Sequence, residues 1–105
     1  MSHCECEDLH PGNTATVELF DVNVNGGELR DDATVTVTVK TLAGAVVANG
    51  NAIPMPNFAS GAYRGVLPSN LGITSGQKYS VEISATIPGG GDGFWQIDKI
   101  AKKRT

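Results

Sequence analysis

The chain has 105 residues, of which 40% are hydrophobic and 18% charged, a balance that supports one folded domain and excludes an intrinsically disordered chain. β-Branched residues are frequent beside 13 glycines and 5 prolines, which favours strands and turns over helices. No stretch reaches the roughly 18 apolar residues of a membrane-spanning helix, and the first residues lack the basic and apolar regions of a signal peptide, so we expect neither membrane association nor signal-directed export.

The net charge of −3 combines an acidic front with a basic end. Residues 1–32 hold eight acidic side chains against one arginine, whereas residues 99–105 hold four basic ones. This polarity would suit head-to-tail association or binding of a polyanion, whereas the simpler explanation is a solvated basic tail that keeps a small domain soluble. Nucleic-acid binding is disfavoured because no strand face interleaves basic and aromatic residues.

Residues 1–13 predict a flexible amino-terminal arm, because they are polar and end in the turn-forming run HPGN at residues 10–13. A single sandwich domain is expected over residues 14–105, ending in a short basic carboxy-terminal tail. The two cysteines, Cys4 and Cys6, are one residue apart and would close almost no loop as a disulfide. The core must therefore rest on hydrophobic packing.

The first strand is expected over residues 14–24, although its alternation slips. Its apolar residues fall on two faces, with Val17 and Leu19 on one and Phe20, Val22 and Val24 on the other. A bulge near residues 19–20, or a strand buried on both faces, would reconcile this pattern. A charged loop follows.

Residues 33–41 and 77–87 alternate apolar with polar side chains, the two-residue period of half-buried strands. The positions expected in the core are Val35, Val37, Val39, Tyr79, Val81 and Ile83. On the wet face, Thr34, Thr36 and Thr38 form a hydroxyl row that ordinary β-propensity explains.

Further short strands are expected over residues 45–48, 61–67 and 94–101, and the glycine-rich residues 88–93 are expected to form a hairpin loop. Pro54 and Pro56 lack backbone donors, so residues 52–58 are an edge segment or a crossover. About seven short strands without an amphipathic helix predict an all-β, two-sheet antiparallel sandwich.

The run GAYRGVLP at residues 61–68, followed by Leu71, Gly76 and Tyr79, resembles the E-to-F strand region of immunoglobulin-like and fibronectin type III sandwiches. The resemblance implies an immunoglobulin-like topology and a corner role for Tyr79, whose hydroxyl would bond to backbone between Leu71 and Gly76. The only tryptophan, Trp95, lies near the end of the chain and no cysteine pair bridges the sheets. The standard immunoglobulin core is therefore absent.

The Thr-Val alternation, the GAYRGVLP segment and the basic end together are similar to small β-sandwich proteins of bacteriophage and prophage structural regions. This resemblance implies a structural or protein-interaction module with protein partners and a cytoplasmic or virion localisation. The alternatives are a metal-handling sandwich and a soluble ligand- or glycan-binding module. The sequence holds no nucleophile-and-base constellation, phosphate loop or dinucleotide fingerprint, so we expect no catalytic activity.

The arm carries a dense set of metal-ligand residue types, namely His3, Cys4, Cys6 and His10. Two thiols and two imidazoles suit tetrahedral zinc or the softer copper(I). Their spacing differs from the Cys-x-x-Cys of common structural sites, and the metal itself would have to order the arm. We therefore expect opportunistic zinc or copper binding without a constitutive cofactor, and an arm whose removal leaves stability nearly unchanged.

Phe94 and Trp95 are adjacent, so in a strand one ring enters the core and the other lies on the surface. An exposed aromatic beside an unpaired sheet edge would anchor a protein partner. The alternative is a terminal strand covered on both sides. We expect a homo-oligomer whose interface includes Phe94 or Trp95.

Overall fold

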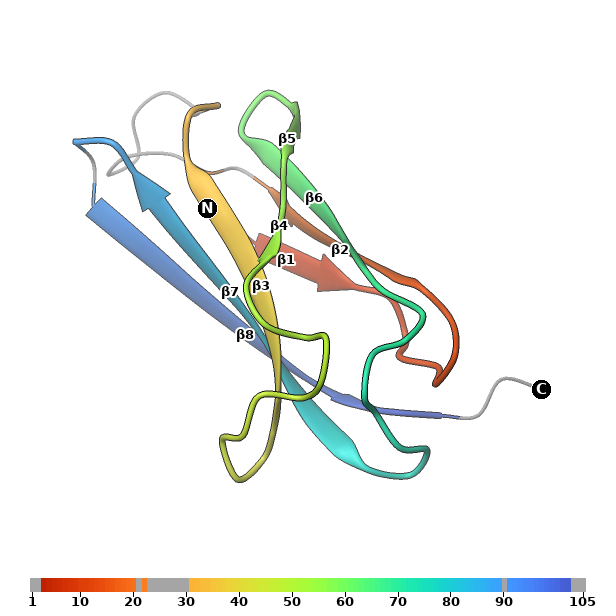
Figure 1. Ribbon diagram of the computed structural model, residues 1–105. Coiled ribbons are helices and arrows are strands. Elements are labelled where there is room, and N and C mark those ends of the chain that lie inside the picture. Colours follow the sequence, from red (N-terminus) through yellow and green to blue (C-terminus); the bar gives the residue numbers. More distant parts are fainter. Residues whose placement is uncertain (1–2, 21, 23–30, 90, 103–105) are drawn as a thin grey trace.

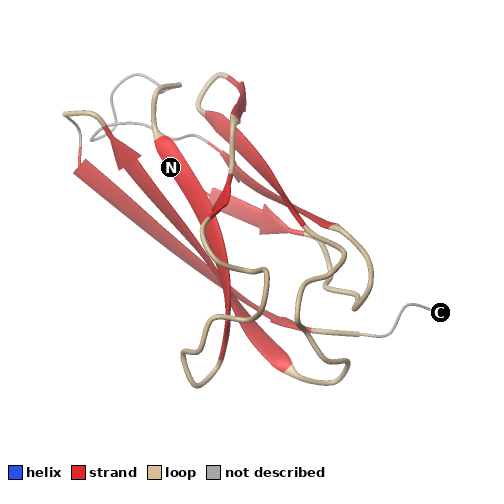
Figure 2. Ribbon diagram, in the orientation of Figure 1, coloured by secondary structure: helices blue, strands red, loops and turns tan. Residues whose placement is uncertain are grey.

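The computed structural model describes residues 3–20, 22, 31–89 and 91–102, which form two antiparallel sheets of four strands each (Figure 1). Figure 2 shows that all regular elements of this part of the chain are strands. The first sheet has the order β1 (His3–Cys6), β2 (Ala15–Phe20), β6 (Ala62–Leu67) and β5 (Asn57–Ala59). The second has the order β4 (Ile53–Pro54), β3 (Thr34–Thr41), β7 (Lys78–Ile87) and β8 (Gly91–Ile100). The expected all-β, two-sheet antiparallel sandwich is confirmed.

The alternation in β3 and β7 places the core where the sequence predicts it. Their register sets Val37 opposite Ile83, and neither side chain has exposed surface. The other four expected core positions on these strands are buried as well. Strand periodicity therefore identified the centre of the sandwich.

β2 ends before its apolar pattern does. Val17 and Leu19 point inward, whereas Phe20 is half-buried at the end of the strand. Val22 is buried beyond it, and its amide donates a hydrogen bond to the Gly61 carbonyl at 2.9 Å. Because Leu19 and Val22 are three residues apart and both buried, the two-residue alternation stops between them. The expected position of Val24 lies outside the described residues.

The amino-terminal segment is part of the sandwich, in contrast to the expected flexible arm. β1 pairs antiparallel with β2 and sets Cys4 opposite Leu19. Farther on, Leu9 is 1% exposed, and its carbonyl accepts a hydrogen bond from the Lys102 amide at 2.9 Å. The apparent polarity of this segment conceals one apolar face, because Cys4 and Cys6 pack against the core while the acidic side chains stay exposed.

The proline-containing segment crosses from one sheet to the other, as expected. β4 pairs with β3 in the second sheet, and β5 pairs with β6 in the first, each at an edge. Between them, Met55 is buried. The crossover runs close to Gly65, where a Cβ atom would lie 2.7 Å from Met55 Cγ and 3.2 Å from the Pro54 carbonyl oxygen. Gly65 therefore leaves room for the chain to change sheets.

Two buried tyrosines hold neighbouring segments through their hydroxyls. The Tyr79 hydroxyl accepts a hydrogen bond from the Thr74 amide at 2.8 Å, within the connection where the resemblance implies such a bond. Tyr63, which the sequence did not single out, is 1% exposed, and its hydroxyl accepts a hydrogen bond from the Ala33 amide at 3.0 Å. Because Tyr63 lies in β6 and Ala33 precedes β3, this bond links the two sheets.

Candidate functional site

The candidate metal ligands lie in β1 and in the segment that follows it, at His3, Cys4, Cys6 and His10. Cys4 and Cys6 are free thiols, half-buried against the core. The His10 ring is engaged at the end of the chain, with Nδ1 2.8 Å from the Lys102 carbonyl oxygen. Within the described residues, no three His, Cys, Asp or Glu side chains gather to hold a metal ion. Strand alternation instead directs the thiols into the sandwich.

Burial also changes the chemistry of the thiols. Loss of solvation raises the pKa of Cys4, and it raises the pKa of Cys6 to about 11 despite the nearby positive charge of Lys99. Such thiols are protonated at neutral pH, whereas the thiolate is the form that binds metals and attacks electrophiles. Both cysteines therefore act as small apolar side chains.

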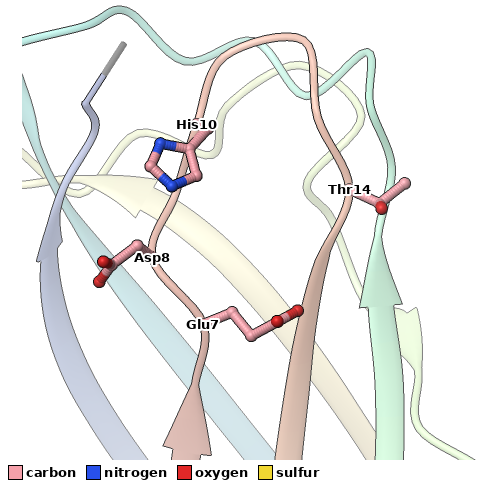
Figure 3. Close-up of a pocket in the computed structure, with 4 residues that line it drawn as sticks. All are labelled: Glu7, Asp8, His10 and Thr14. Atoms are coloured by element: carbon pink, nitrogen blue, oxygen red, sulfur yellow. The ribbon is translucent and has the colours of Figure 1, made fainter. Parts of the chain in front are cut away.

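The segment between β1 and β2 borders a polar hollow of about 290 Å³, lined by Glu7, Asp8, His10 and Thr14 (Figure 3). A carboxylate oxygen of Glu7 accepts a hydrogen bond from the Thr16 amide at 2.6 Å. The Asp8 carboxylate lies 3.5 Å from the Lys99 ammonium. Glu7 and Asp8 therefore bind the amino-terminal segment to β2 and β8, and His10 contacts the Lys102 carbonyl. Because these polar groups already have partners within the chain, we assign no ligand to the hollow.

Hydroxyl side chains occupy much of the outer face of the second sheet. Thr34 lies opposite Thr86, and Thr36 lies opposite Ser84, so β7 extends the threonine row of β3. These four side chains are small and neutral. They offer hydrogen bonds but no large apolar anchor for a protein partner.

β8 differs from the rest of this sheet because it exposes large apolar side chains at an edge. Phe94 is 58% exposed and Ile100 is 48% exposed. Trp95 faces the opposite way, half-buried against the core. Its ring lies beside Gly93, where a Cβ atom would come within 2.5 Å of the ring. The sequence predicted that one of these two rings faces the core and the other the surface. Phe94 is the exposed ring, and Trp95 is the one that packs against the core.

Within the described part of the chain no strand pairs with the outer edge of β8, which lies at the rim of the sandwich (Figure 1). Beyond Ile100, Leu9 occupies that side of the chain. The Ala101 amide donates toward β7, to the Gln77 carbonyl at 2.9 Å, whereas the Lys102 amide donates to the Leu9 carbonyl at 2.9 Å. Backbone groups alternate in direction along a strand. Even-numbered residues of β8 therefore turn their N–H and C=O groups toward the free edge.

The first sheet carries a second aromatic group on its outer face. The Phe20 and Phe58 rings meet edge to face with centroids 6.2 Å apart. The Arg64 guanidinium lies 4.0 Å from the Phe58 centroid and 2.9 Å from a Glu18 carboxylate oxygen. Sequence reasoning missed this group because it depends on the registers of β2, β5 and β6. Its ring faces and charges have partners within the chain, so it offers less to a partner protein than β8 does.

Comparisons of the chain with protein-family models, with curated proteins and with solved structures found no match. Within the described residues there is no helix that could cross a membrane. The function must therefore be argued from the chemistry of this chain.

Proposed function

We propose that the chain is a non-catalytic protein-interaction module that self-associates through the free edge of β8 and serves as a structural component of a phage or prophage particle. The observation that carries the proposal is a ten-residue edge strand with Phe94 and Ile100 exposed on it. Long unpaired edges are templates for pairing with another chain, and apolar side chains beside the edge add surface that pairing would bury. A repeating particle component needs such contacts between copies.

The strand order supports an immunoglobulin-like topology as part of this proposal. In that fold the first, second, fifth and fourth strands form one sheet, and the third, sixth and seventh form the other. With β4 set aside as an additional edge strand, the orders β1-β2-β6-β5 and β3-β7-β8 follow the same sequence. The hydrogen bond of Tyr79 adds to the likeness.

Sedimentation velocity at micromolar concentration tests the self-association. We expect the parent chain to form a dimer that Phe94→Ser weakens, while Val66→Ser leaves it intact. Val66 is a matched control because it is 52% exposed on β6, in the other sheet. The dimer should persist in high salt, since backbone and apolar contacts are screened little. A monomer at every concentration, or equal behaviour of the two variants, would contradict the proposal.

A further inference from the structure

We infer that two copies pair β8 with β8 in an antiparallel register whose two-fold axis passes through Ile97, joining their second sheets into one eight-stranded sheet. The inference rests on the proposed self-association. It adds which strand of the second copy pairs with β8, the antiparallel direction of the two strands, and the residues that lie opposite one another.

The backbone of β8 suits this pairing. Its outward groups belong to residues 92, 94, 96, 98 and 100, as the hydrogen bonds of Ala101 and Lys102 establish. With the axis at Ile97, Gln96 of one copy lies opposite Asp98 of the other, and both residues have groups facing the partner. Each such pair exchanges two hydrogen bonds in an antiparallel ladder.

The side chains favour the axis at Ile97. In this register Phe94 lies opposite Ile100 of the second copy, so the two exposed apolar side chains of β8 cover each other on the outer face. Cross-strand apolar pairs stabilise sheets. The pairing ends at Ile100, because beyond it the Leu9 carbonyl of the same chain accepts the hydrogen bond of the Lys102 amide.

Neighbouring registers lack this complementarity. An axis at Gln96 sets Phe94 against Asp98 of the second copy. An axis at Asp98 brings the two Asp98 carboxylates together, and an axis at Trp95 sets Asp92 against Asp98. Like charges directly opposite one another destabilise a strand pair, and a carboxylate opposite an apolar ring leaves that ring uncovered. The charges and apolar residues of β8 therefore select one register.

The proposed contact closes at two copies, because both contribute the same edge. The far edge of the joined sheet is β4, which has two residues, and one of them, Pro54, has no N–H to donate. An inward-pointing lysine commonly protects a sheet edge. In β8 the Lys99 ammonium lies 3.5 Å from the Asp8 carboxylate of its own chain. Because this ion pair neutralises the lysine within one copy, Lys99 does not oppose pairing with a second copy.

Cysteine cross-linking tests the register with two variants, Gln96→Cys and Asp98→Cys, at exposed positions of β8. Directly opposite residues in hydrogen-bonded pairs have Cα atoms about 5.5 Å apart, within the range of a disulfide, whereas diagonal neighbours lie about 7–8 Å apart. We expect mild oxidation of a mixture to link residue 96 of one copy to residue 98 of the other, at least about tenfold more than either variant links to itself. Peptide mass mapping identifies the linked residues, so Cys4 and Cys6 stay in place.

The outcomes separate the register from the self-association. A dimer in which Gln96→Cys or Asp98→Cys links to itself places the axis elsewhere and overturns the register while keeping the proposed function. A dimer without any of these links shows that another surface holds the copies together and also overturns the inference. A chain that sediments as a monomer throughout removes the proposed function and the inference with it.

Discussion

Leu9→Ala tests whether the amino-terminal segment stabilises the sandwich. Leu9 follows β1 and belongs to the core, with 1% of its surface exposed. The substitution leaves in place the backbone carbonyl that accepts the hydrogen bond from Lys102. The change in the free energy of unfolding therefore reports on the loss of the side chain.

The expected loss follows from burial. Removing three carbon atoms at about 0.8 kcal/mol each costs about 2.4 kcal/mol in transfer free energy. The cavity left behind raises the expected range to about 2.7–5 kcal/mol. Leu42 supplies the matched control, because it is 62% exposed, and Leu42→Ala should change the free energy of unfolding by less than about 0.5 kcal/mol.

Urea denaturation followed by the fluorescence of Trp95 compares the two variants. For a denaturant dependence of about 2 kcal/mol per molar urea, a loss of about 3 kcal/mol lowers the midpoint by about 1.5 M. Equal midpoints for Leu9→Ala and Leu42→Ala would refute the structural role of the segment. Removal of residues 1–10, expected from the sequence to be harmless, should be more damaging than Leu9→Ala because it also takes away β1.

Three further predictions concern the core and the thiols. Val37→Ala should destabilise the fold by on the order of 2 to 4 kcal/mol and Thr36→Ala by far less, and similar losses in denaturant melts would count against the two-face assignment. Tyr79→Phe should cost about 1 kcal/mol in the same melts, because the Thr74 amide loses its acceptor; an unchanged stability would argue against the corner bond. The pKa of Cys6 is higher in the folded chain than its ordinary value of 9.0, so its stabilising contribution is full below pH 9 and falls as the pH rises toward 11. Melts across this range should show a decline that Cys6→Ala reduces, and an identical decline in that variant would exclude Cys6 as a source.

Local sequence patterns predicted the parts of the fold that depend on local chemistry. The alternation in β3 and β7 identified the buried faces because a sheet with one dry face requires that period. Pro54 and Pro56 predicted an edge segment or a crossover, because proline lacks the backbone N–H that a central strand donates. The bond of Tyr79 was foreseen from a resemblance that begins at residue 61 and covers only part of the chain.

The features that escaped prediction depend on partners distant in the sequence. β1 looks like a polar tail until it lies beside β2, when Cys4 and Cys6 are seen to share an inward face. Leu9 enters the core beside Lys102, which is about 90 positions away in the sequence. Neither the pairing of β1 with β2 nor the burial of Leu9 can be inferred from the composition of this segment. For the same reason the sequence singled out Phe94 and Trp95 as a pair, but their register with β7 was needed to tell the exposed ring of Phe94 from the half-buried ring of Trp95.

Amide hydrogen exchange along β8 tests the pairing of its free edge most directly. Amides of the odd-numbered residues face β7 and should exchange slowly at all protein concentrations. We expect the amides of Phe94, Gln96, Asp98 and Ile100 to exchange rapidly in dilute solution and to become protected as the concentration rises and the dimer forms. Rapid exchange of these four amides in samples that sedimentation shows to be dimeric would contradict the pairing of β8 with β8.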